Sequence, residues 1–139
     1  MISKPLRTAF SVFIISCLLS LPASAFAAET RLEKVMPEGG KVVLTFAAAP
    51  LLTMTETPFT VELTGATGKT LTDAAVSLQL VMPAMSMPLN NPKAHWKGSA
   101  YHGSAVFTMA GEWNAIMIIQ RPGHDVVDLI FNLGEVLMK

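Results

Sequence analysis

The chain has 139 residues, is 51% hydrophobic, and contains equal numbers of acidic and basic residues. A chain of this length can build one hydrophobic core and is too short for two. Because basic residues are not in excess, the sequence lacks the electrostatic footprint of a nucleic-acid-binding protein.

The first 27 residues are predicted to be a signal peptide. Lys4 and Arg7 precede an apolar run from Thr8 to Leu21, and small residues follow this run. This order of a basic, an apolar and a small-residue segment is typical of secretory leaders. Cleavage is expected after Ala25 or Ala27, which each complete an A-x-A triplet. The sequence therefore predicts a periplasmic protein.

Two alternatives remain open for this leader. The uncharged segment 8–28 is about as long as the roughly 20 residues that span a bilayer, so an uncleaved anchor would also fit. Membrane contact is expected only in that case. Lipidation at Cys17 is the other alternative, because the residues before it loosely resemble a lipobox. Cys17 is the only cysteine, so the domain predicted at 28–139 has no disulfide and no thiolate ligand.

The rest of the sequence predicts an all-β domain. Short β-branched runs and a period-2 alternation of apolar and polar residues are typical of strands with one buried face. Strands are predicted at 41–46, 58–64, 75–82, 101–109, 113–120 and 126–133. The segment 83–98 is predicted as a long loop with room for a short extended piece. Six to seven strands in a domain of this size favour an antiparallel, immunoglobulin-like β-sandwich.

Three methionines follow the strand predicted at 75–82. Met82, Met85 and Met87 lie between or beside two prolines in the run M-P-A-M-S-M-P. A thioether is soft, uncharged and never protonated at ordinary pH, so this run is a candidate Cu(I) site. The alternative is that methionine only fills irregular gaps in the packing.

Other segments supply further candidate ligands. If the strands follow immunoglobulin order, the connections that carry Met54, Met85 and Met109 all fall at one end of the sandwich, and His124 falls at the other. His95 lies in the predicted long loop and is a candidate nitrogen ligand. His102 is interpreted as a solvent-facing residue of its strand.

Two sequence runs carry a family resemblance. The first is V-x-L-x-L-x-M-P-x-M from Val76 to Met85, and the second is Y-x-G-x-x-x-F-x-M-x-G-x-W from Tyr101 to Trp113. In these runs the chain resembles the YtkA-like and FixH-like periplasmic domains, over roughly 59–136. The resemblance implies an immunoglobulin-like domain outside the cytoplasm. It also implies a link to copper handling, because relatives occur beside or fused to copper efflux adaptors and oxidase assembly factors.

No hydrolase motif is present: the sequence has no G-x-S-x-G elbow and no H-E-x-x-H. The first hypothesis is therefore a periplasmic, non-enzymatic protein that binds Cu(I) and delivers it to a copper efflux or oxidase-assembly partner, or sequesters it. Its expected ligands are Met82, Met85 and Met87, with Met54, Met109 and His95 as further candidates. The second hypothesis is a metal-free interaction module whose Met-rich loop contacts a protein partner.

Overall fold

The computed structural model describes residues 28–139, so the predicted signal peptide lies outside the described residues. The described chain is all-β, as predicted, and contains no helix that is long and apolar enough to span a membrane. Its strands are β1 (Thr30–Val35), β2 (Lys41–Phe46), β3 (Thr57–Thr64), β4 (Ala75–Val81), β5 (Lys93–Lys97), β6 (Ala100–Ala105), β7 (Gly111–Gln120) and β8 (Val127–Val136).

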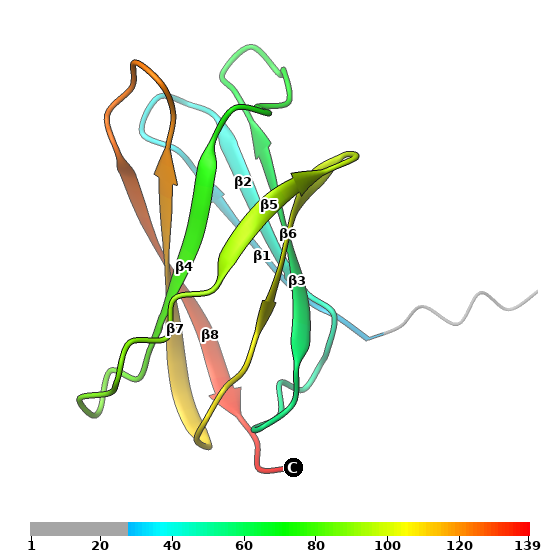
Figure 1. Ribbon diagram of the computed structural model, residues 1–139, viewed down its shortest axis with the longest axis vertical. Coiled ribbons are helices and arrows are strands. Elements are labelled where there is room, and N and C mark those ends of the chain that lie inside the picture. Colours follow the sequence, from blue (N-terminus) through cyan, green and yellow to red (C-terminus); the bar gives the residue numbers. More distant parts are fainter. Residues whose placement is uncertain (1–27) are drawn as a thin grey trace, which may run out of the picture.

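The strands form one nearly closed antiparallel sheet. They hydrogen-bond in the order β1-β2-β3-β6-β5-β4-β7-β8. In Figure 1, β4, β7 and β8 lie on one side, β1, β2, β3 and β6 lie on the other, and β5 crosses between them. The expected count of six to seven strands and the expected separation into two sheets are thus corrected.

β5 is the element that joins the two sides. Its Ala94 pairs with Val76 of β4, and its Trp96 pairs with Tyr101 of β6. The sequence does not show the alternation typical of a strand here, because only one of the five residues of β5, Ala94, is buried. The short extended piece expected inside the loop is therefore the strand that makes the sheet continuous.

The edge strands β1 and β8 approach each other. The Lys34 ammonium group on β1 lies 5.8 Å from the centroid of the Phe131 ring on β8. Beyond β8, the Leu137 amide donates to the carbonyl of Leu51, and the Thr53 amide donates to the carbonyl of Leu137. The connection between β2 and β3 therefore holds the C-terminal end of β8 in place.

Inward-facing apolar side chains from both sides fill the space between them. Phe46 packs against Phe59 and Phe107, with ring centroids 5.8 Å apart in each pair, and Phe107 meets Trp113 edge-on at 5.3 Å. Trp113 has no exposed surface and is therefore a core residue. Aromatic pairs in such tilted or edge-on geometry stabilise a core beyond their area burial.

Most predicted strand boundaries are close to the observed ones. The strand at 41–46 is confirmed, while the one predicted at 101–109 ends at Ala105. Beyond Ala105, Phe107 forms an isolated parallel bridge with Thr53 in the β2–β3 connection. This connection also contains a cis peptide bond between Ala49 and Pro50.

Candidate metal centre

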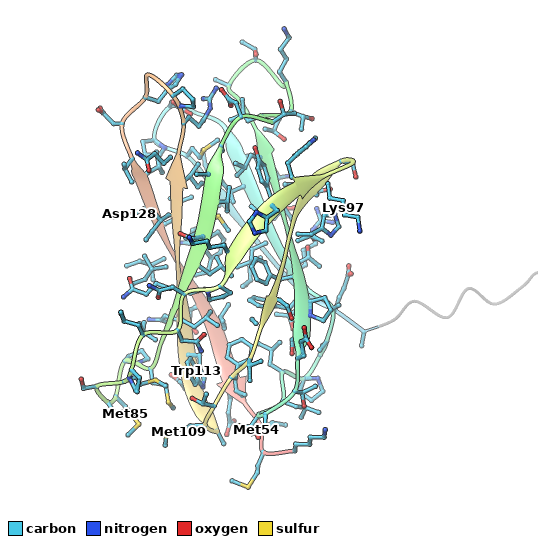
Figure 2. The ribbon with its side chains drawn as sticks, viewed as in Figure 1. Met54, Met85, Lys97, Met109, Trp113 and Asp128 are labelled. Carbon is cyan, nitrogen blue, oxygen red and sulfur yellow. The ribbon has the colours of Figure 1, made fainter. Side chains whose placement is uncertain are left out.

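The connections at one end of the sheet carry the methionines. Met54, Met85 and Met109 come from the β2–β3, β4–β5 and β6–β7 connections, and Figure 2 shows all three at the same end, which we call the methionine end. The β7–β8 turn, which contains His124, lies at the opposite end in Figure 1. The prediction that chain reversal gathers these methionines, although they are far apart in sequence, is confirmed.

Met54 and Met109 are fixed by neighbouring backbone contacts. The Met54 amide donates to the carbonyl of Phe107 at 2.8 Å, which ties the β2–β3 connection to the segment just before Met109. The buried Trp113 indole donates to the Met109 carbonyl at 2.9 Å. The side chains themselves stay in solvent, with exposed fractions of 68% for Met54 and 44% for Met109.

The Met-bearing loop between β4 and β5 folds back along β4. The Leu80 amide donates to the Asn90 carbonyl, and the Leu78 amide donates to the Pro92 carbonyl, each at 2.9 Å. The Asn90 side-chain amide donates to the carbonyl of Val106 at 2.9 Å. The loop is therefore held between β4 and the β6–β7 connection that carries Met109.

The three methionines of this loop have different surroundings. Met82 is 8% exposed. It packs against Gly111, the first residue of β7: a Cβ added to Gly111 would lie only 2.7 Å from the terminal methyl carbon of Met82. Met87 is half-buried against the core. Met85 is 46% exposed, and it lines with Met87 a hollow of about 190 Å³. Met85 and Met87 are thus more exposed than Met82.

A sixth methionine at this end was not predicted from the sequence. Met138 is 78% exposed, and the next residue, Lys139, donates its amide to the Thr53 hydroxyl at 3.2 Å. Met138 therefore lies beside the segment that carries Met54. The signal for it was available, because an antiparallel last strand that starts at the His124 turn must end at the methionine end.

His95 lies elsewhere. It is an exposed residue of β5, and the pairing of Ala94 with Val76 places it near the start of β4, whereas Met82 follows the end of β4. Six residues of extended chain separate these positions, a length of about 20 Å. The structure thus gathers Met54, Met82, Met85, Met87 and Met109 at one end and places His95 on the side of the sheet.

The chemistry of this end is that of neutral sulfur donors. The thioethers of Met54, Met85, Met109 and Met138 are exposed, and a thioether is a soft ligand that suits Cu(I). Within residues 28–139, no group of three or more His, Cys, Asp or Glu side chains is arranged to hold a metal ion.

Comparison with protein families gives one match. The family model described as YtkA-like matches residues 34–117, from the end of β1 into β7. The matched range includes Met54, the Met-bearing loop and Met109. Searches of curated proteins and of solved structures give no match.

Proposed function

Because the chain belongs to the YtkA-like family, and its resemblance to that family implies a link to copper handling, we propose that it is a periplasmic protein that binds Cu(I) through the methionine end. One observation carries the proposal. Three connections that are far apart in sequence expose Met54, Met85 and Met109 at the same end of the sheet.

The proposed ligand set has two arms. Met85 and Met87 form one arm on the loop that follows β4, and Met54 and Met109 form the other across the Met54–Phe107 hydrogen bond. Met82 supports the site from below, because it packs against Gly111. The rigid sheet positions both arms, which lowers the entropy lost when a metal ion orders them.

The exposure of these ligands favours transfer over storage. An ion held by side chains in solvent can be reached by the ligands of a second protein, which can then displace the first ligands one at a time. Of the two roles expected from the sequence, chaperone and sequestering protein, this exposure favours the Cu(I) chaperone, with a copper efflux or oxidase-assembly protein as its partner. The predicted signal peptide supports a periplasmic site of action.

The same end supports a second candidate function. Leu137 and Met138 are exposed beside Met54, which makes this end apolar as well as rich in sulfur. Methionine adapts its shape to different surfaces and is frequent at binding faces that accept several partners. The alternative is an interaction module that docks this end on a protein and binds no metal.

Cu(I) affinity of leucine variants distinguishes the two functions. Leucine resembles methionine in volume but lacks the sulfur, so such a change should cost less than about 1.5 kcal/mol of stability. We expect the double variant Met85→Leu/Met87→Leu to bind Cu(I) at least about tenfold more weakly, which corresponds to about 1.4 kcal/mol. The measurement is anaerobic competition with a chromogenic Cu(I) chelator, together with thermal unfolding.

The matched control is Met36→Leu. Met36 is a buried methionine at the β1–β2 turn, so this variant removes a sulfur without changing the methionine end. Its Cu(I) affinity should equal that of the unmodified protein. If the unmodified protein binds no Cu(I), or if the double variant binds as well as the control, the metal function is wrong and the interaction module remains.

A further inference from the structure

Two histidines lie directly opposite each other on neighbouring strands. His95 of β5 pairs with His102 of β6 in the antiparallel register. Both side chains are exposed, while the flanking Ala94 and Tyr101 are buried. Because successive residues of a strand point to opposite faces, His95 and His102 both stand on the outer face of the sheet.

This pairing brings two imidazole rings within reach of one ion. Side chains directly opposite each other in an antiparallel pair have Cβ atoms roughly 4.5–5.5 Å apart. A metal ion with nitrogen bonds of about 2.0–2.1 Å needs the two nitrogens to approach within roughly 3 Å. Rotation about two side-chain bonds in each histidine can meet this requirement without any movement of the backbone.

We propose that His95 and His102 form a binding site for a divalent transition-metal ion, Zn(II) or Cu(II). Imidazole nitrogen is a ligand of intermediate softness that suits these ions, whereas the soft Cu(I) favours the thioethers. The site is distinct from the methionine end, because His95 lies about 20 Å along β4 from the position of Met82. Two protein ligands leave the remaining coordination positions to water or to an external ligand.

Charged neighbours set the strength of this site. Lys93 and Lys97 lie two residues on either side of His95 and share its face of β5. Their ammonium groups oppose a cation, while the exposed carboxylate of Glu62 lies on β3 two residues beyond Thr60, the residue that pairs with His102. We therefore expect a moderate affinity, and the lysines favour an anionic external ligand on the bound ion.

A metal ion at this position would act on the strand that makes the sheet continuous. β5 contacts β4 through only two register pairs, Val76–Ala94 and Ser77–Lys93. A bridge from His95 to His102 would fasten β5 to β6 from the outside. Since a ligand that prefers the folded state stabilises it by mass action, Zn(II) should raise the melting temperature.

Zn(II) and Cu(II) binding by untagged protein tests the site. The chain contains three histidines, so His124→Ala is the matched control. Isothermal titration calorimetry should give one equivalent of Zn(II) with a dissociation constant below about 100 µM. His95→Ala and His102→Ala should each weaken binding at least about tenfold, and the double variant should add little, because either change alone destroys the chelate.

Three further measurements make the outcome decisive. Bound Cu(II) should show coupling to two imidazole nitrogens in its electron paramagnetic resonance spectrum and should quench the fluorescence of Trp96, the neighbour of His95. Met85→Leu/Met87→Leu should leave Zn(II) binding unchanged, so a failure of the copper proposal does not affect this one. The proposal is wrong if neither metal binds, if one histidine alone suffices, or if His124→Ala loses the metal as well.

Discussion

At the scale of single residues, Met54 has a backbone conformation that its side chain does not favour. Its φ is +52°, the left-handed region, and among the described residues it is the non-glycine residue with a positive φ. This conformation costs a residue with a Cβ roughly 1–2 kcal/mol. The Met54 side chain is mostly in solvent, so packing does not repay the cost. A role at the surface, such as metal binding, would account for methionine at this position.

Replacing Met54 by glycine should separate stability from function. Glycine adopts a positive φ freely, although it also makes the unfolded chain more flexible. We expect Met54→Gly to leave the free energy of unfolding unchanged or to raise it by up to about 1 kcal/mol, while Cu(I) affinity falls. Met54→Ala is the control, because it removes the sulfur and keeps the strain. Urea unfolding and chelator competition measure the two effects, and a marked loss of stability in Met54→Gly would contradict this account.

At the scale of elements, Tyr101 ties β6 to the connection between β3 and β4. Its hydroxyl donates to the Leu71 carbonyl at 2.7 Å and accepts from the Ala74 amide at 3.1 Å. Burial of the phenol raises the pKa of Tyr101 above its ordinary value of 10.0, and the nearby charge of Asp73 adds to this rise. The fold therefore favours the neutral phenol.

This pKa shift predicts a loss of stability at high pH. Below pH 10 the phenol is neutral in both states and its contribution is complete; above pH 10 the unfolded chain ionises first, so stability falls as the pH rises toward the folded pKa. Tyr101→Phe should remove this fall and cost about 1–3 kcal/mol at neutral pH, because the Ala74 amide and Leu71 carbonyl lose a partner. Because Tyr101 is the only tyrosine, absorbance at alkaline pH reports its ionisation directly. Equal pH dependence in both proteins would refute the prediction.

The strands that could be predicted from sequence are those in which the alternation of apolar and polar residues matches the alternation of buried and exposed positions. β3 and β4 alternate strictly between buried and less buried positions, and both were predicted to within one residue. β1 was missed because it is an edge strand with no buried residue, held by its pairing with β2. β5 was expected only as a short extended piece within the loop 83–98, because it follows three prolines and buries only Ala94. Both strands are held by pairing with other strands, and the local sequence pattern does not show this pairing.

The candidate sites follow the same rule. Chain reversal predicted that Met54, Met85 and Met109 would lie at one end of the domain, because this prediction depends only on the number of strands between them. The placement of His95 opposite His102 depends instead on the register of β5. The sequence therefore indicated only that His102 faces solvent, and not that it lies beside a second histidine. Residues whose shared location depends only on the number of strands between them were predictable, while those whose proximity depends on strand register were not.

At the scale of the whole molecule, the two proposed sites lie on separate parts of one rigid sheet. The methionine end is built from connections that follow β2, β4 and β6, and the histidine pair stands on the outer face of β5 and β6. They share no ligand and differ in chemistry, with thioethers at one and imidazoles at the other. A protein arranged in this way could bind Cu(I) and a divalent ion at the same time.

Independent binding is therefore the expected behaviour of the intact protein. Sites that are more than about 7–10 Å apart and share no partners usually act additively. Saturation with Zn(II) should change the Cu(I) dissociation constant by less than about twofold, since a larger change would require a coupling of more than roughly 0.4 kcal/mol. His95→Ala/His102→Ala should likewise leave Cu(I) affinity unchanged. Chelator competition with and without Zn(II) measures this, and a tenfold change in either direction would mean that the two ions compete for a ligand or that β5 and the methionine loop move together.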